Sequence, residues 1–261
     1  MLLFFFMNPL AKKYYETGGF QEVLFLSEKT FDWETLSFKV PELPRSWYEL
    51  AYVPLKARIE FLSNLWGDHF TYHPIASAAI SHFFSSLDDV EIALIKNESL
   101  YSVEMVYSMK DNCSFFRGFP PVTEQDIRIF QMETNPDLPK DYCSFFLLHN
   151  GFGKLSEMGL LQMSEIPSAN EKVTTLLQNQ SNREGRLIDP KTLIPFFETM
   201  GSFQCFFSDW YPNSEMGNVF LSGINYTVSD TTNSGMWEEE CAFPTFLEWL
   251  SRYLRGMNIS H

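Results

Sequence analysis

The chain has 261 residues, of which 45% are hydrophobic and 20% are charged. This length and composition fit one large domain or two ordinary ones, and they exclude a protein that is disordered throughout. The formal net charge is −14 at pH 7, and residues 1–118 and 119–261 are both acidic. The chain therefore lacks the basic footprint expected of a protein that binds nucleic acid or an anionic membrane.

The first part of the chain predicts strands and helices in mixed order. Residues 8–40 alternate short aromatic runs with turn residues, and Val23–Leu26 within them predicts a strand. A helix follows in which apolar residues step by four, three and four positions, the spacing of one helix face. Its apolar residues are Leu55, Ile59, Leu62 and Trp66. Pro74–Leu87 predicts a second helix, because proline suits the first helical turn.

A hairpin and a domain boundary are predicted next. Val90–Ile95 and Leu100–Tyr107 predict two strands of a hairpin, and residues 113–117 predict a third strand. Helix and strand breakers then cluster at Gly118-Phe119-Pro120-Pro121. We place a boundary there, which gives an α+β amino-terminal domain over residues 1–118 and a second domain over residues 119–261.

Two helices open the second domain. Thr123 and Asp126 form a capping signal for a helix that reaches Glu133. Pro139 then opens a helix with one apolar face, and Asn150-Gly151 is predicted to end it, because both residues tolerate the left-handed conformation of a C-cap. The apolar face of this helix is predicted to hold Tyr142, Phe145, Phe146 and His149.

The rest of the chain predicts a run of strands followed by one helix. The strands are short, rich in aromatic and β-branched residues, and separated by turn residues. They are predicted at Gly159–Gln162, Leu193–Phe197, Phe203–Ser208, Gly217–Leu221 and Asn225–Ser229. A part of Ser164–Gln180 predicts a helix, and Phe243–Arg255 predicts the last one. Helices, then strands, then a helix indicate an α+β fold with an antiparallel-rich sheet.

Three short segments resemble the SMI1/KNR4 (SUKH) domain family. The first is Leu138-Pro139-Lys140-Asp141-Tyr142, followed after a short aromatic helix by His149-Asn150-Gly151. The second is Leu193-Ile194-Pro195-Phe196 with Gln204-Cys205-Phe206-Phe207-Ser208-Asp209 after it. The third is Phe243-Pro244-Thr245-Phe246-Leu247-Glu248-Trp249-Leu250, which resembles the closing helix of the family. Their order and spacing carry more of the resemblance than any one of them alone.

The resemblance covers residues 119 to 257 and leaves residues 1–118 unrecognised. It implies a mixed, antiparallel-rich sheet flanked by helices, here preceded by an α+β amino-terminal domain. It also implies a non-enzymatic function, because SUKH-like proteins are typically immunity proteins that neutralise toxins, or intracellular interaction and regulatory proteins. The expected partner is then a protein, either a toxin or a regulatory target, and no cofactor is expected.

An acidic surface that carries aromatic residues is the predicted contact for that partner. Glu238, Glu239 and Glu240 form the densest acidic run and follow Trp237. Asp209 and Trp210 offer the same combination after a predicted strand. Acidic side chains attract a basic partner, and tryptophan supplies an apolar anchor. The alternatives are a solvated surface for the acidic run and a hairpin turn at residues 209–211.

The sequence carries only weak signals for a catalytic or metal-binding site. Gly151-Phe152-Gly153 follows a predicted helix rather than a strand, so a helix end explains it better than a dinucleotide site. His69 and His73 have the spacing of two metal ligands on one helix face, but Gly67 and Pro74 favour two turn histidines. His149 is expected to pack or to cap a helix. The alternative function is an intracellular hydrolase that uses Asp209, His149 or the histidines at 69 and 73 in a cleft between the two halves.

The cysteines and the first residues bear on location. Cys113, Cys143, Cys205 and Cys241 form no C-x-x-C pair, and so few cysteines in a long chain indicate a reduced, cytoplasmic protein. Met1–Met7 is apolar, but it is too short for the core of a signal peptide or for a membrane span. The sequence leaves open whether Met1 or Met7 is the true start, and it does not give the oligomeric state.

Overall fold

The structure is a computed structural model of the chain. It describes residues 8–70, 73–97, 100–111, 113–134, 138–176, 192–199, 201–207, 217–221, 243 and 245–255, with only the backbone at 207 and 217–221. Its helices are α1 (Pro9–Thr17), α2 (Trp33–Lys39), α3 (Arg45–Ala51), α4 (Leu55–His69), α5 (Pro74–Ser85), α6 (Glu124–Thr134), α7 (Lys140–Phe146), α8 (Ile166–Leu176) and α10 (Phe246–Leu254). Two short 3₁₀ turns lie at Leu26–Glu28 and Met163–Glu165.

The described strands form one antiparallel sheet. They are β1 (Glu22–Phe25), β2 (Leu87–Asn97), β3 (Leu100–Met109), β4 (Phe115–Gly118), β5 (Phe152–Lys154), β6 (Gly159–Leu160), β7 (Leu193–Thr199), β8 (Ser202–Phe207) and β9 (Gly217–Leu221). Each strand pairs with the next one along the chain, in the order β1 to β9. The predicted α+β fold with an antiparallel-rich sheet is confirmed.

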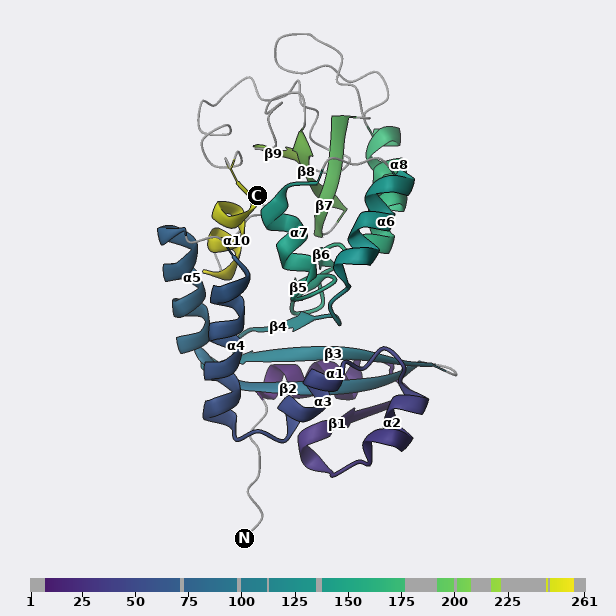
Figure 1. The fold of residues 1–261 in the computed structure, drawn as a ribbon, viewed down its shortest axis with the longest axis vertical. Helices are drawn as coiled ribbons and strands as arrows, with labels where there is room; N and C mark the ends of the chain where they lie inside the picture. The colour runs from purple at the N-terminus through teal and green to yellow at the C-terminus, as the bar shows by residue number, and fades with distance from the viewer. Residues whose placement is uncertain are drawn as a thin grey trace.

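The direction of the strands changes along this sheet. In Figure 1, the long hairpin of β2 and β3 lies horizontally, whereas β7 and β8 run close to the vertical axis of the view. The short strands β4, β5 and β6 lie between these two parts, and β4 pairs with both β3 and β5. The sheet therefore continues across the predicted boundary at residue 118, and the division into two domains stays a prediction.

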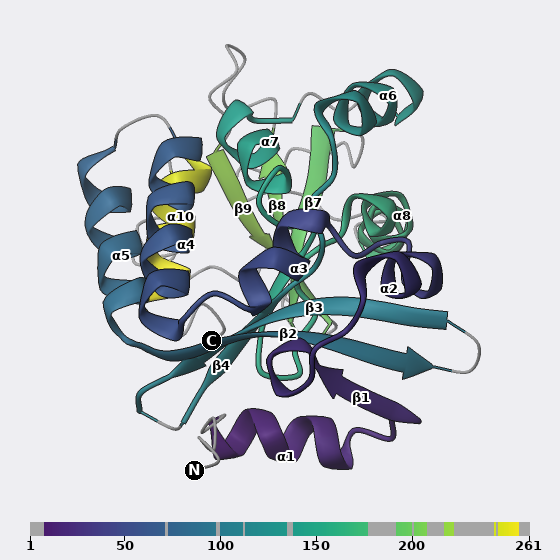
Figure 2. The same cartoon turned by 60° about the horizontal axis from the view of Figure 1, so that its bottom comes forward.

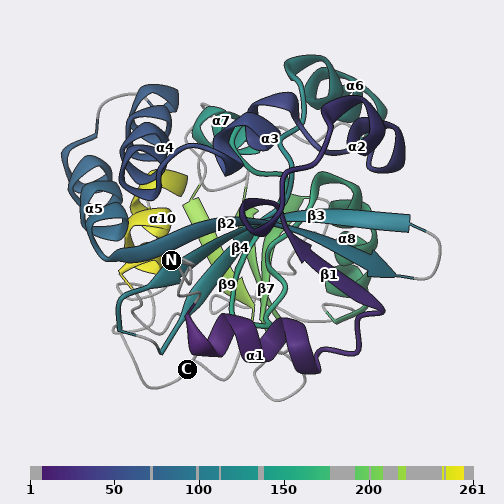
Figure 3. The same cartoon turned by 90° about the horizontal axis from the view of Figure 1, so that it is seen from below.

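Helices cover both faces of the first part of the sheet. Figures 2 and 3 show α1 on one side of β1, β2 and β3, and α2 and α3 on the other side. Asn8 fixes α1 in place, because its side-chain oxygen accepts from the backbone N–H of Leu10 at 2.8 Å while its amide donates to the carbonyls of Met109 and Ser114. With both faces covered, β2 is buried along almost its whole length, which explains the continuous apolar run at residues 92–95.

Helices from both parts of the chain pack side by side. The last helix, α10, lies against α5 and α7, as Figure 2 shows for α5. One cluster of buried apolar residues runs from Leu26 and Trp66 to Phe196 and Leu254. A smaller cluster lies under α1 and includes Ala11, Tyr15 and Phe115. The helix α8 packs beside β7.

Three predictions about elements need correction or lie outside the described residues. Residues 8–40 contain two helices, α1 and α2, where turns were predicted, because Asn8 and Asp32 each cap a helix start. The helix after Pro139 ends at Phe146 rather than at Asn150-Gly151, so that prediction was wrong. The predicted strand Asn225–Ser229 lies outside the described residues.

Candidate functional site

The six residues predicted to contact a partner lie outside the described residues. They are Asp209, Trp210, Trp237, Glu238, Glu239 and Glu240. The structure therefore gives no geometry for the predicted acidic face. It does describe the strand before Asp209, which is β8, and the helix after Glu240, which is α10.

The three segments that carry the family resemblance meet in one aromatic cluster around Tyr142. The Tyr142 ring, on α7, lies 6.0 Å from the ring of Phe196 and 5.0 Å from that of Phe246, measured between centroids. Phe196 on β7 stacks on Phe206 of β8 at 4.3 Å, and Trp249 of α10 meets it edge-on at 5.0 Å. All five side chains are buried. Rings in these arrangements gain energy beyond the burial of their area.

Asp141 links the first of these segments to the third. One of its carboxylate oxygens accepts from the backbone N–H of Leu247, at the start of α10, at 3.0 Å, and the other accepts from Tyr142 N–H. The carboxylate thus satisfies a free donor of a helix more than a hundred residues away in the chain. Burial raises the pKa of Asp141, and the backbone hydrogen bonds oppose that rise.

His149 is a core histidine with both ring nitrogens engaged. Its Nε2 lies 2.7 Å from the Tyr107 hydroxyl, and its Nδ1 lies 3.1 Å from the Phe119 carbonyl oxygen. Since a carbonyl only accepts, Nδ1 carries the proton and Nε2 accepts from the tyrosine. The side chain is 1% exposed, and burial lowers its pKa to about 4. The prediction of a packed histidine is confirmed, although His149 lies after α7 and not on its face.

The surroundings of His149 come from both parts of the chain. Trp47 of α3 and Trp66 of α4 lie 5.6 and 5.8 Å from its ring centroid, and Phe152 of β5 lies 5.6 Å away. Gly118 lies directly under the ring, so that a Cβ there would stand 2.3 Å from Nδ1. The glycine is needed for this close approach. The imidazole is sealed from water, which does not suit a general base that must reach a substrate.

His69 and His73 have separate local roles. The Nδ1 of His69, the last residue of α4, lies 2.9 Å from the carbonyl oxygen of Leu65. His73 caps α5 through its Nδ1, which accepts from Ala76 N–H at 3.4 Å, and its Nε2 lies 3.5 Å from a carboxylate oxygen of Glu248. His73 therefore joins α5 to α10 across the two parts of the chain.

The described cysteines, Cys113, Cys143 and Cys205, form no disulfide with one another. Cys113 is exposed, Cys143 is half-buried, and Cys205 is buried in the core, where burial raises its thiol pKa. Within the ranges that the structure describes, no group of three or more histidine, cysteine, aspartate or glutamate side chains is placed to hold a metal ion.

A buried arginine connects the hairpin β2–β3 to the turn between β5 and β6. Arg117 donates from Nη1 to Glu104 at 3.0 Å, from Nε to the Leu155 carbonyl at 2.7 Å, and from Nη2 to the Glu157 carbonyl at 3.0 Å. Tyr15 of α1 donates to the other oxygen of Glu104 at 2.6 Å. The sequence analysis missed this network. The sequence does contain a signal for it, which is a glutamate and an arginine inside apolar strands. Charged side chains that are buried in such strands are almost always paired.

A groove lined by apolar and charged side chains lies between α6 and α7. It encloses about 500 Å³. Its apolar lining includes Ile127, Leu138 and Leu147, and its rim carries Glu124, Arg128 and Lys140. On the same helix, α6, Ile129 is 44% exposed and Met132 is 84% exposed. Neither of these two side chains lines the groove.

Comparisons with known proteins give one match. A model of the SMI1/KNR4 family (SUKH-1) matches residues 121–252, which is about half of the chain. Neither a curated protein nor a solved structure matches. None of the helices in the described ranges combines the length and the apolar character needed to cross a membrane.

Proposed function

Because the chain belongs to the SMI1/KNR4 (SUKH-1) family, we propose that it is a non-enzymatic protein-binding module that acts by covering a surface of a partner protein. The match to the family, over residues 121–252, is the single observation that carries this proposal. Proteins of this family are typically immunity or regulatory proteins. The partner is then a toxin or an endogenous target, and the compartment is the cytoplasm.

Charge gives the proposed partner its chemistry. The net charge of −14 favours a basic partner, because opposite potentials steer encounter and suppress wrong partners. We assign the contact to the acidic, aromatic face of Asp209, Trp210, Trp237 and Glu238–Glu240. Met132 and Ile129 on α6 offer a second, apolar contact inside the family match.

The alternative of a hydrolase loses support from the position of His149. That histidine is 1% exposed, and its two ring nitrogens are bonded to Tyr107 and Phe119. A base in this position cannot reach a substrate without opening of the core. His73 is engaged in capping α5.

The test is affinity capture from native lysate with the full chain as bait and mass spectrometry as the readout. A variant with Glu238→Lys, Glu239→Lys and Glu240→Lys removes the acidic face. The matched control is Glu16→Lys, Glu42→Lys and Glu60→Lys, which changes the net charge equally at exposed positions elsewhere. A stoichiometric partner is expected with the wild type and the control but not with the first variant.

A further variant separates the two contacts. Met132→Glu places a charge on the exposed side of α6 without touching the acidic run. Loss of the partner with Met132→Glu alone would assign the contact to α6. Capture that survives reversal of all three glutamates would show that the acidic face is not the contact. Absence of any partner with every bait would count against a binding module and favour a screen for hydrolase substrates.

A further inference from the structure

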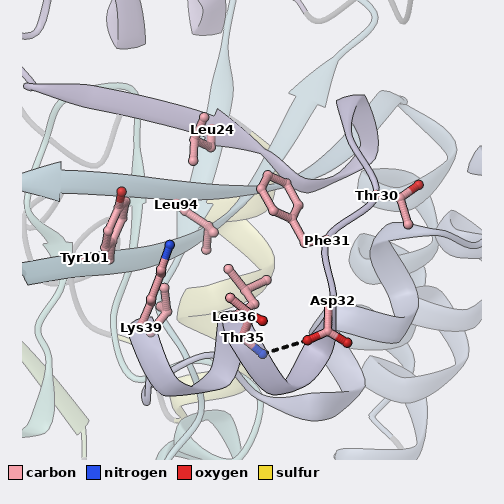
Figure 4. Close-up of a pocket in the computed structure, with 10 residues that line it drawn as sticks. Leu24, Thr30, Phe31, Asp32, Thr35, Leu36, Lys39, Leu94 and Tyr101 are labelled. Carbon is pink, nitrogen blue, oxygen red and sulfur yellow. Dashed lines mark hydrogen bonds between the residues drawn. The ribbon is translucent and has the colours of Figure 1, made fainter.

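A hollow of about 220 Å³ lies between α2 and the strands β1, β2 and β3. It lies before residue 121 and so outside the family match. Its apolar walls are Leu24, Phe31, Leu36, Val40 and Leu94. Figure 4 labels all of them except Val40. A cavity of about 150 Å³ lined by such side chains is large enough to bind benzene. This hollow is therefore large enough for an aromatic ring or a short alkyl chain.

The walls of this hollow are held in place by the core. Leu36, Val40 and Leu94 are 5%, 1% and 0% exposed, and all three belong to the main apolar cluster. Phe31 is fixed through its backbone, because its carbonyl accepts from the Tyr48 hydroxyl at 2.7 Å and its N–H donates to the Tyr52 hydroxyl at 3.1 Å. The site is thus formed before a ligand arrives, which reduces the entropy lost on binding.

Two charged residues line the hollow, and they differ in what they contact. The Asp32 carboxylate accepts from the backbone N–H of Thr35 at 2.9 Å and caps α2, a contact drawn in Figure 4. This hydrogen bond lowers the pKa of Asp32 and commits its charge to the helix. Lys39, the last residue of α2, lies one turn after Thr35. Its ammonium group has no ion-pair or hydrogen-bond partner among the described residues. In Figure 4 its ammonium group lies on the side of Leu94 and Tyr101.

Tyr101 completes the polar end of the hollow. Its hydroxyl donates to Glu22 at 2.9 Å, so that Glu22 is engaged by the tyrosine. Lys96 lies over the Tyr101 ring at 5.9 Å and adds a second cation at this end. An apolar floor with uncommitted positive charge at one end has the chemistry that recognises an apolar group bearing an anion.

We propose that this hollow binds a small amphipathic carboxylate, with its aromatic or alkyl group against the half-buried side chains of Leu24 and Phe31 and its carboxylate on the Lys39 ammonium. Binding is non-covalent and goes beyond the proposed protein-binding function. It uses no residue of the acidic face or of α6, so the two proposals fail or succeed separately.

The experiment is a titration of the full chain, labelled with ¹³C at the leucine and valine methyl groups, with 4-phenylbutanoate. The methyl signals of Leu24, Leu36, Val40 and Leu94 report the position of the ligand, and calorimetry gives the dissociation constant. The neutral probe is 4-phenylbutan-1-ol, and the cationic probe is 4-phenylbutylamine. Both probes have the same carbon skeleton as 4-phenylbutanoate and differ from it in the head group and its charge.

Three variants accompany the titration. Lys39→Met removes the charge and keeps an apolar stem. Lys56→Met is the matched control, because Lys56 is exposed on α4 and does not line the hollow. Thr35→Trp places a large ring at the edge of the hollow on an exposed position of α2 and is expected to abolish binding.

The expected result is methyl shifts confined to the hollow and tighter binding of the acid than of the alcohol or the amine. Lys39→Met should weaken the acid by about three- to fivefold, the range of an exposed ion pair, and leave the alcohol unchanged. Lys56→Met should change neither. Equal affinity for acid and alcohol in the wild type would overturn the assignment of a carboxylate. Absence of methyl shifts at millimolar acid would overturn the site itself.

Discussion

Both regions bury aromatic rings, but among the described residues only the amino-terminal region (residues 8–118), and not the family segment (residues 121–252), buries charged side chains. The buried charged side chains of the described residues are Arg58, Asp89, Glu91, Glu104 and Arg117, all in the amino-terminal region. The buried polar side chains described in the family segment are His149, Thr199, Gln204 and Ser251, and burial keeps His149 neutral by lowering its pKa. The two regions are therefore held by different interactions.

Directional bonds fix the amino-terminal region. Arg58 donates to the Ala51 carbonyl at 2.9 Å, to the Val53 carbonyl at 3.1 Å and to Glu91 at 3.1 Å, and it also donates to the Val90 carbonyl. One guanidinium thus joins the turn between α3 and α4 to β2. In the family segment, the close fit of Tyr142, Phe196 and Trp249 serves the same purpose without charge. The difference predicts which substitutions each region tolerates.

The largest expected effect is that residues 119–261 alone do not fold. Without residues 1–118, β5 loses its partner β4, His149 loses the Tyr107 hydroxyl, and the ring of Phe152 loses Trp66. Far-UV circular dichroism and the dispersion of amide NMR signals measure the outcome, with the full chain as control. A cooperative thermal transition of the fragment would contradict this prediction and support two independent domains.

Arg58→Met should lower the free energy of unfolding by about 3–5 kcal/mol, because it leaves Glu91 buried without its cation. Urea unfolding measures the loss. Arg45→Met is the control, because its ion pair with Glu49 is exposed and is worth less than about 1 kcal/mol. Equal losses in the two variants would mean that the buried pair has no special role.

Gly118→Ala should destabilise by about 2–3 kcal/mol, because the added methyl would meet the His149 ring at 2.3 Å and force it from both hydrogen bonds. Gly67→Ala is the matched substitution, since a Cβ at Gly67 of α4 meets nothing within 4 Å. That variant should gain about 1 kcal/mol from better helix propensity. The two variants can be compared by thermal unfolding, and a stable Gly118→Ala would show that the ring can move.

Tyr107→Phe should destabilise by about 1–2 kcal/mol, because it leaves Nε2 of the buried His149 without a donor. The NMR shifts of the imidazole nitrogens and urea unfolding give the readout. Tyr48→Phe also removes a tyrosine hydroxyl bond, but at a half-buried position on α3, and serves as the control. A neutral effect of Tyr107→Phe would mean that Nε2 finds another donor.

The last expected effect depends on pH and compares Asp89 with His149. Burial, reinforced by the nearby charge of Glu91, raises the pKa of Asp89 to about 7. The folded protein then keeps a proton that the unfolded chain has lost, so stability falls as pH rises from about 4 to 7. His149 has a pKa lowered to about 4, so its contribution is lost as pH falls below about 6.5. The two effects oppose each other.

Asp89→Asn isolates one of them. The stability of the variant relative to the wild type should increase by about 1 kcal/mol per pH unit between pH 5 and 7 and then level off. Urea unfolding at a series of pH values measures this difference. A difference that does not change with pH would show that Asp89 has an ordinary pKa in the folded protein.

Local patterns were sufficient for much of the fold. The apolar stripe of α4, the hairpin of β2 and β3, and the capping pair Thr123 and Asp126 at α6 were all predicted, and Thr123 and Asp126 do bond to each other. These signals lie within a few residues of one another, so that neighbours in the sequence decide them. The starts of α1 and α2 were equally local, at Asn8 and Asp32, but were overlooked among the aromatic runs.

Periodicity, caps and breakers act over short distances, so they were enough to predict the fold class and the three segments that resemble the family. The cap that Asp141 forms on α10, the position of Gly118 under His149 and the hollow beside Lys39 became visible only in the folded chain. Each of these depends on residues tens or hundreds of positions apart. Such contacts are set by the packing of the whole chain, and no local pattern specifies them.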